Sequence, residues 1–214
     1  MEEKKLNQAE SLELITRMIN QTKRHLHIGQ GNLLLVWGYV SVIVSIAVGV
    51  SLYLTNGNPA CNWLWFLIWI VGGIATVVIS KREKKQVDKA PVTYVDRLTS
   101  NLWCTIGLTF GVATIMSFIF NFCGYDTWRI MFIFAFLLIG IAVSIQGSIF
   151  RENSMIFGGA VSIVVGIFIT CCILAGITLK VLWAIPLFAL CFIFALIIPG
   201  HVLNAKAKKQ CSKN

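Results

Sequence analysis

The sequence contains six apolar runs, each of about 20 residues, and such a run is long enough to cross roughly 30 Å of bilayer hydrocarbon as an α-helix. Hydrophobic residues make up 57% of the chain and charged residues 13%, whereas about a quarter of an average soluble domain is charged. A helix in a soluble core does not need to be apolar on all sides over this length. The sequence therefore predicts an all-α, polytopic membrane protein rather than a soluble enzyme or binding domain.

The runs and their flanking segments predict the domain organisation. Residues 29–203 should form six transmembrane helices, arranged as three hairpins, at 32–54, 62–80, 100–122, 128–150, 154–176 and 181–203. The basic block at 81–85 should stop the second helix at the membrane edge, and Pro199-Gly200 should mark the end of the sixth. Residues 204–214 are short and basic, so they are expected to form a disordered tail.

Residues 1–28 are polar and precede the first span. Apolar side chains recur at three- and four-residue spacing from Leu12 to Leu26, which predicts an amphipathic helix. Three placements are open for this helix: beneath the protein's own loops, on the lipid headgroups, or against a protein partner or second copy of the chain. No apolar segment with a small-residue cleavage site precedes it, so a cleaved signal peptide is not expected.

Small residues repeat at every fourth position of the fifth span. This spacing keeps them on one helix face, which is typical of membrane helices that pack backbone to backbone. The third span carries a shorter GxxxG version of the pattern. The predicted helix-packing residues are Ser154, Gly158, Ser162, Gly166 and Thr170, together with Gly107 and Gly111.

These ridges also predict which helices lie at the centre of the bundle. The fifth span has the longest ridge and should be the most closely contacted helix, with the fourth span as its first neighbour because the turn between them is short. The sixth span has no such ridge and contains Pro186, so it is expected at the edge of the bundle.

The net charge of +9 reflects basic residues at the predicted membrane edges. All Lys and Arg residues except Arg129 and Lys180 fall on one predicted side, which the positive-inside rule places in the cytoplasm with both termini. Membrane topology and anionic lipid explain this charge without nucleic acid. The densest group, the candidate for contact with anionic lipid or a partner, comprises Lys81, Arg82, Lys84 and Lys85.

The middles of the spans contain essentially no ionisable residues, which weakens a proton-pump or ion-coupled transporter hypothesis. Gln146 and Asn121 are the strongest polar residues within the spans, and Ser144 and Ser148 flank Gln146. Either they line the path of a solute, or Gln146 makes a hydrogen bond between helices. No metalloprotease or serine-hydrolase motif and no pair of intramembrane aspartates occurs, so neither catalysis nor a cofactor is predicted.

The seven cysteines show no CxxC or Cys/His ligand spacing. Cys61 and Cys123 both fall in loops predicted on the outer side, where disulfides are permitted. Either they form a bridge that ties the first two hairpins together, or they are two free thiols.

The segments at 10–15 (ESLELI) and 198–204 (IPGHVLN) resemble the ends of small multi-pass bacterial membrane proteins of uncharacterised activity. The resemblance implies a bacterial inner-membrane location and carries no activity or functional residue with it. The first functional hypothesis is a non-enzymatic scaffold or regulatory interaction protein that works through its basic cytoplasmic face, with a protein partner or in a homo-oligomer. The alternative is a small channel or carrier for a neutral or lipid-like solute.

Overall fold

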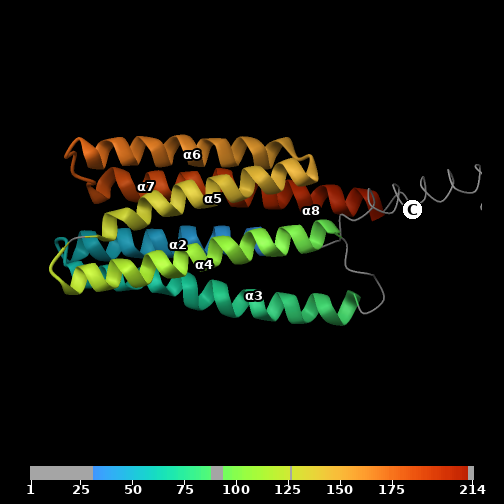
Figure 1. The fold of residues 1–214 in the computed structure, drawn as a ribbon, viewed down its shortest axis with the longest axis horizontal. Helices are drawn as coiled ribbons and strands as arrows, with labels where there is room; N and C mark the ends of the chain where they lie inside the picture. The colour runs from blue at the N-terminus through green and yellow to red at the C-terminus, as the bar shows by residue number, and fades with distance from the viewer. Residues whose placement is uncertain (1–30, 88–93, 126, 212–214) are drawn as a thin grey trace, which may run out of the picture.

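The computed structural model describes residues 31–87, 94–125 and 127–211, and every regular element among them is a helix (Figure 1). Six of its helical stretches are long and apolar enough to cross a membrane. The chain is therefore a multi-pass helical membrane protein, which confirms the predicted fold class. The amphipathic helix predicted within residues 1–28 lies outside the described part of the chain.

The spans follow one another along the chain as α-helices, two of them with a segment of different pitch. They are α2 (Asn32–Leu54), η1 (Pro59–Trp65) with α3 (Phe66–Val87), α4 (Tyr94–Phe122), α5 (Trp128–Phe150), α6 (Asn153–Leu174), and finally α7 (Val181–Phe192), η2 (Ile193–Ile197) and α8 (Ile198–Cys211). The last three run on without a break, and η2 is a π-helix. The bounds of α2 and α5 are those predicted from the apolar runs.

Two basic segments are helical where the sequence predicted an end. The helix α3 continues through Lys81 and Arg82 to Val87, and α8 passes Pro199 and continues to Cys211. Lysine and arginine are good helix formers, and cations near a helix C-terminus interact favourably with the helix dipole. A basic block therefore ends the membrane-embedded part of a helix without ending the helix itself.

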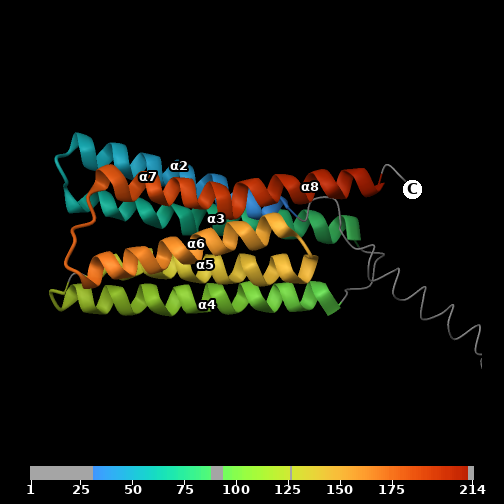
Figure 2. The same cartoon turned by 90° about the horizontal axis from the view of Figure 1, so that it is seen from above.

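The helices lie side by side and antiparallel to their chain neighbours (Figures 1 and 2). The α2–α3, α4–α5 and α6–α7 connections lie at one end of the bundle. The α5–α6 turn, the start of α4 and the C-terminal ends of α3 and α8 lie at the other end. The α5–α6 turn is tight because Arg151 adopts a left-handed conformation (φ 55°) and reverses the chain within three residues.

The last span packs between α2 and α6, so the prediction that it lies at the edge is wrong. A Cβ atom added to Gly38 of α2 would lie 2.7 Å from Ile197, and one added to Gly49 would lie 3.1 Å from Ile185. The neighbouring helices thus provide the small residues, and the last span fills the space with bulky ones. A ridge of small residues marks only one partner of a contact, which is why its absence did not predict exposure.

The π-helical segment η2 has a local cause and a matching surface on α6. Pro199 has no N–H, and its ring would clash with the carbonyl four residues earlier in an α-helix, so the turn before it widens. On the facing helix, a Cβ added to Gly158 would lie 2.2 Å from the carbonyl oxygen of Phe194. Gly158 therefore makes room for the widened backbone of η2.

Aromatic rings fill the space between the spans. Phe188 and Phe192 stack with ring centroids 4.3 Å apart, and Phe136 meets both edge-on with no side-chain exposure of its own. The least buried spans, α3 and α4, approach each other through rings such as Trp69 and Phe110, whose centroids are 5.4 Å apart. Aromatic burial on this scale dominates core packing energetics.

Candidate functional site

Exposed cations gather at the end of the bundle where α8 leaves it, which we call the basic end. The C-terminal part of α3 and the start of α4 lie there (Figure 1). Lys81 and Arg82 on α3 and Arg97 on α4 are exposed. Arg151, Lys206, Lys208 and Lys209 add exposed cations from the α5–α6 turn and α8. Lys84 and Lys85, the other predicted contact residues, lie in the last turns of α3. Among the described residues, the only cations at the opposite end are Arg129 and Lys180.

A carboxylate that sequence reasoning missed lies buried within this basic end. The side chain of Glu152 is only 6% exposed, and it forms an ion pair with Lys206, whose side chain is 52% exposed. The Ser154 hydroxyl lies 3.5 Å from the second carboxylate oxygen. Glu152 looked like an ordinary turn residue, but it is the single acidic residue between two long apolar runs. The ion pair connects the α5–α6 turn to α8.

Three further hydrogen bonds connect α8 to α2 and to Gly31 just before it. The side chain of Asn204 accepts a hydrogen bond from the Gly31 amide at 3.1 Å and donates one to the side chain of Asn32 at 2.8 Å. Tyr39 and His201 share a hydrogen bond of 2.8 Å. The helix that carries Lys208 and Lys209 is therefore held to the bundle from two sides.

The structure places Gln146 and Ser144 in helix contacts and not along a solute path. The indole N–H of Trp103 on α4 donates a 3.0 Å hydrogen bond to the Gln146 side-chain carbonyl, and Gln146 is 3% exposed. The Ser144 hydroxyl faces α6, where a Cβ added to Gly159 would lie 2.2 Å from it. Of the two interpretations of Gln146, the geometry supports the hydrogen bond between helices.

We expect Trp103→Phe to lower the free energy of unfolding by about 1 kcal/mol, because it leaves the buried Gln146 carbonyl without its donor. Thermal unfolding in a fixed detergent measures the change. Trp63→Phe is the matched control, since that side chain is 59% exposed, packs on the rings of Phe66 and Phe118, and has no indole hydrogen bond among the described residues. Equal effects of the two substitutions would contradict a stabilising role for the Trp103–Gln146 bond.

The predicted ridge on α6 faces two different neighbours. The Ser162 hydroxyl donates to the Phe136 carbonyl of α5 at 2.8 Å, and a Cβ on Gly166 would lie 2.7 Å from Leu137. Gly158 faces η2, as described above. At the ends of the ridge, Thr170 donates to the carbonyl of Gly166 within its own helix, and Ser154 belongs to the Glu152 cluster.

Gly107 and Gly111 do not pack against another span, which corrects the prediction for the third helix. A Cβ added to either residue would meet no atom within 4 Å among the described residues. Gly107 is exposed and the neighbouring Leu108 is 70% exposed. The GxxxG spacing is therefore on the outward face of α4 in this chain.

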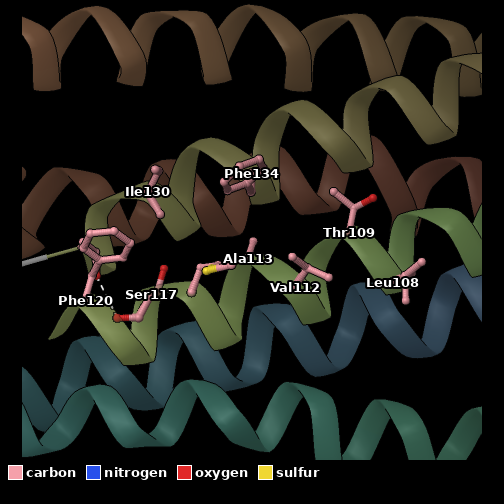
Figure 3. Close-up of a pocket in the computed structure, with 10 residues that line it drawn as sticks. Leu108, Thr109, Val112, Ala113, Ser117, Phe120, Ile130 and Phe134 are labelled. Atoms are coloured by element: carbon pink, nitrogen blue, oxygen red, sulfur yellow. Dashed lines mark hydrogen bonds between the residues drawn. The ribbon is translucent and has the colours of Figure 1, made fainter. Parts of the chain in front are cut away.

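A groove of about 630 Å³ lies between α4 and α5 on the outer surface of the bundle (Figure 3). Most of its walls are apolar side chains of both helices. Its lining comprises Leu108, Thr109, Val112, Ala113, Met116, Ser117 and Phe120 from α4, and Ile130 and Phe134 from α5, with Thr127 at the turn. Sequence reasoning missed this groove because two helices that are apolar all round give no signal for a gap between them.

The described part of the chain contains neither a disulfide nor a group of metal-ligating side chains. Cys61 and Cys123 are free thiols, so the two hairpins are not bridged in this structure. Within the described ranges no three His, Cys, Asp or Glu side chains come together as metal ligands.

Comparisons with protein-family models, curated proteins and solved structures find no match. The interpretation of both the basic end and the groove therefore depends on their own geometry.

Proposed function

We propose that this membrane protein is a non-enzymatic scaffold or regulatory interaction protein that works through its basic end. By the positive-inside rule this end faces the cytoplasm, with both termini, and the resemblance of the terminal segments favours a bacterial inner membrane. The observation that carries the proposal is the concentration of exposed cations on helix ends that are fixed to a well-packed bundle.

The chemistry of this end suits anionic groups at the membrane surface. Lys81 and Arg82 directly follow the apolar part of α3, so they lie at headgroup depth. A basic residue near such a surface contributes about 1 kcal/mol of attraction to anionic lipid. An anionic lipid surface is therefore the first partner, and it would orient α8 and its lysines toward further acidic partners.

We expect the double substitution Lys81→Gln with Arg82→Gln to weaken the preference for anionic lipid. Each lost cation should reduce the relative association constant about fivefold, the factor that about 1 kcal/mol gives. Electron paramagnetic resonance with spin-labelled phosphatidylglycerol and phosphatidylcholine measures that constant in reconstituted membranes. High salt should reduce the wild-type preference in the same direction.

Lys180→Gln is the matched control for Lys81→Gln alone, because it removes one exposed cation from the opposite end. If Lys81→Gln and Lys180→Gln lower the lipid preference equally, the basic end has no special role and the proposal fails. The orientation has its own test: a C-terminal green fluorescent protein fusion should fluoresce, whereas a C-terminal alkaline phosphatase fusion should be inactive.

The alternative, a channel or carrier for a neutral or lipid-like solute, has one observation in its favour, the groove between α4 and α5. A route through Gln146 and Ser144 loses its support, because both side chains lie in close helix contacts. The groove runs along the outside of the bundle, so it favours a lipid-like molecule over a small neutral solute.

A further inference from the structure

Ser117 combines two features: among the described residues its hydroxyl has no hydrogen-bond partner, as is also true of Thr99 and Ser144, but Ser117 lines the α4–α5 groove. Thr105, Thr109 and Thr114 on the same helix each donate to the carbonyl four residues earlier, which satisfies the hydroxyl inside the membrane. The Ser117 hydroxyl has no such bond and no other hydrogen-bond partner within the described ranges, although the residue is only 4% exposed. An unpaired hydroxyl in an apolar setting costs free energy, so its position suggests a partner outside the chain.

The Ser117 hydroxyl lies in the wall of the α4–α5 groove (Figure 3). The Ser117 backbone carbonyl is already occupied, because Thr127 donates to it at 2.9 Å. Within the described part of the chain, the hydroxyl therefore remains available as a donor beside the apolar lining. A ligand that fills the groove would need to be mostly apolar and to offer one acceptor at this depth.

The polar and apolar residues of the groove follow one another along α4 and α5 in the same order as the headgroup, ester and acyl regions of a phospholipid. Ser117 lies five residues before the end of α4 at Phe122, which corresponds to roughly 8 Å along the helix axis. Arg129 is the second residue of α5, is exposed, and directly precedes Ile130 of the groove lining. From Ser117 to Leu108 the lining continues inward for roughly 14 Å of helix.

We propose that the α4–α5 groove is a binding site for one glycerophospholipid. An acyl chain fills the apolar part between Met116 and Leu108, an ester carbonyl accepts a hydrogen bond from Ser117, and the phosphate lies near Arg129. A helix of a second copy fits this site less well. Such a helix is about 10 Å wide with its side chains, and its backbone carbonyls are already hydrogen-bonded.

Native mass spectrometry of the detergent-purified full chain, titrated with an ester-linked phosphatidylglycerol, tests the proposal. The wild type should bind one phosphatidylglycerol molecule more tightly than any further molecules of the same lipid. Ala113→Phe, which fills the groove, should abolish that binding, whereas Ile115→Phe should preserve it because Ile115 is exposed on α4 outside the lining. Thermal unfolding checks that both variants are folded.

Ser117→Ala is the milder variant and should weaken binding of the ester lipid about threefold to tenfold, the contribution of one hydrogen bond. A diether phosphatidylglycerol, which has no ester carbonyl, should bind the wild type equally weakly and should not distinguish wild type from Ser117→Ala. Equal binding of both lipids to wild type and variant would overturn the hydrogen bond. If the Ala113→Phe variant binds phosphatidylglycerol as tightly as the wild type does, or if the protein forms a dimer that excludes lipid from the groove, the proposed site is overturned.

Discussion

Gly158→Ala should lower the free energy of unfolding by about 2 to 3 kcal/mol, at the upper end of the cost of overpacking a core. The added methyl group would lie 2.2 Å from the Phe194 carbonyl oxygen and 3.1 Å from the Ala195 Cα. Both obstacles are backbone atoms of η2, so no side-chain rotation can relieve the contact. Either α6 or the last span must move, and the last span is held on its other side by α2. Chemical or thermal unfolding in a fixed detergent measures the loss.

The matched control for this substitution is Gly107→Ala on α4. The change of residue is the same, but the new methyl group meets open space. Alanine favours a helix over glycine by up to about 1 kcal/mol, so this variant should be as stable as the wild type or more stable. Comparable losses from the two substitutions would contradict the assignment of Gly158 to the contact with η2.

The apolar runs of the sequence were enough to predict the spans, and the small-residue ridge with its short turn correctly paired the fourth and fifth spans, which are α5 and α6. The neighbours of the third and sixth spans were not predicted. Apolar length alone located the six helices, because the bilayer imposes the same requirement on each of them. The position of a helix in the bundle depends on shape complementarity between two faces. Gly158 and Gly107 belong to equally plausible small-residue patterns, yet one meets a backbone and the other meets no neighbouring span.

Only part of the candidate site could be predicted from the sequence. The cations of the basic end were visible as a charge asymmetry that follows the positive-inside rule. Glu152 and Ser117 were not visible, since burial and hydrogen-bond partners come from residues far away in the chain. Lys206 lies 54 positions after Glu152, and only the fold brings them together. Pro199 also misled the prediction, because a π-helical turn lets the helix continue past it.

Lys206→Ala should be the most damaging single change at the basic end, with a loss of about 2 kcal/mol. Removing one partner of a buried ion pair typically costs about 3 to 5 kcal/mol, and the smaller figure follows because the Lys206 side chain is about half exposed. The substitution leaves the Glu152 carboxylate buried without its cation. Hydrogen exchange should also become faster in α8 from Asn204 to Cys211, since one of its attachments to the bundle is lost.

Glu152→Gln should cost much less than Lys206→Ala, because a half-exposed lysine without its partner can be hydrated whereas a buried carboxylate cannot. The double variant should then be close to Glu152→Gln alone, since no buried charge remains. Lys208→Ala and Lys209→Ala are controls of the same type at exposed positions and should leave both stability and α8 exchange unchanged. If all three lysine variants behave alike, Glu152 does not hold α8 through Lys206. If only Lys206→Ala destabilises the protein, and the second substitution restores it, the ion pair fixes the helix that presents the remaining lysines.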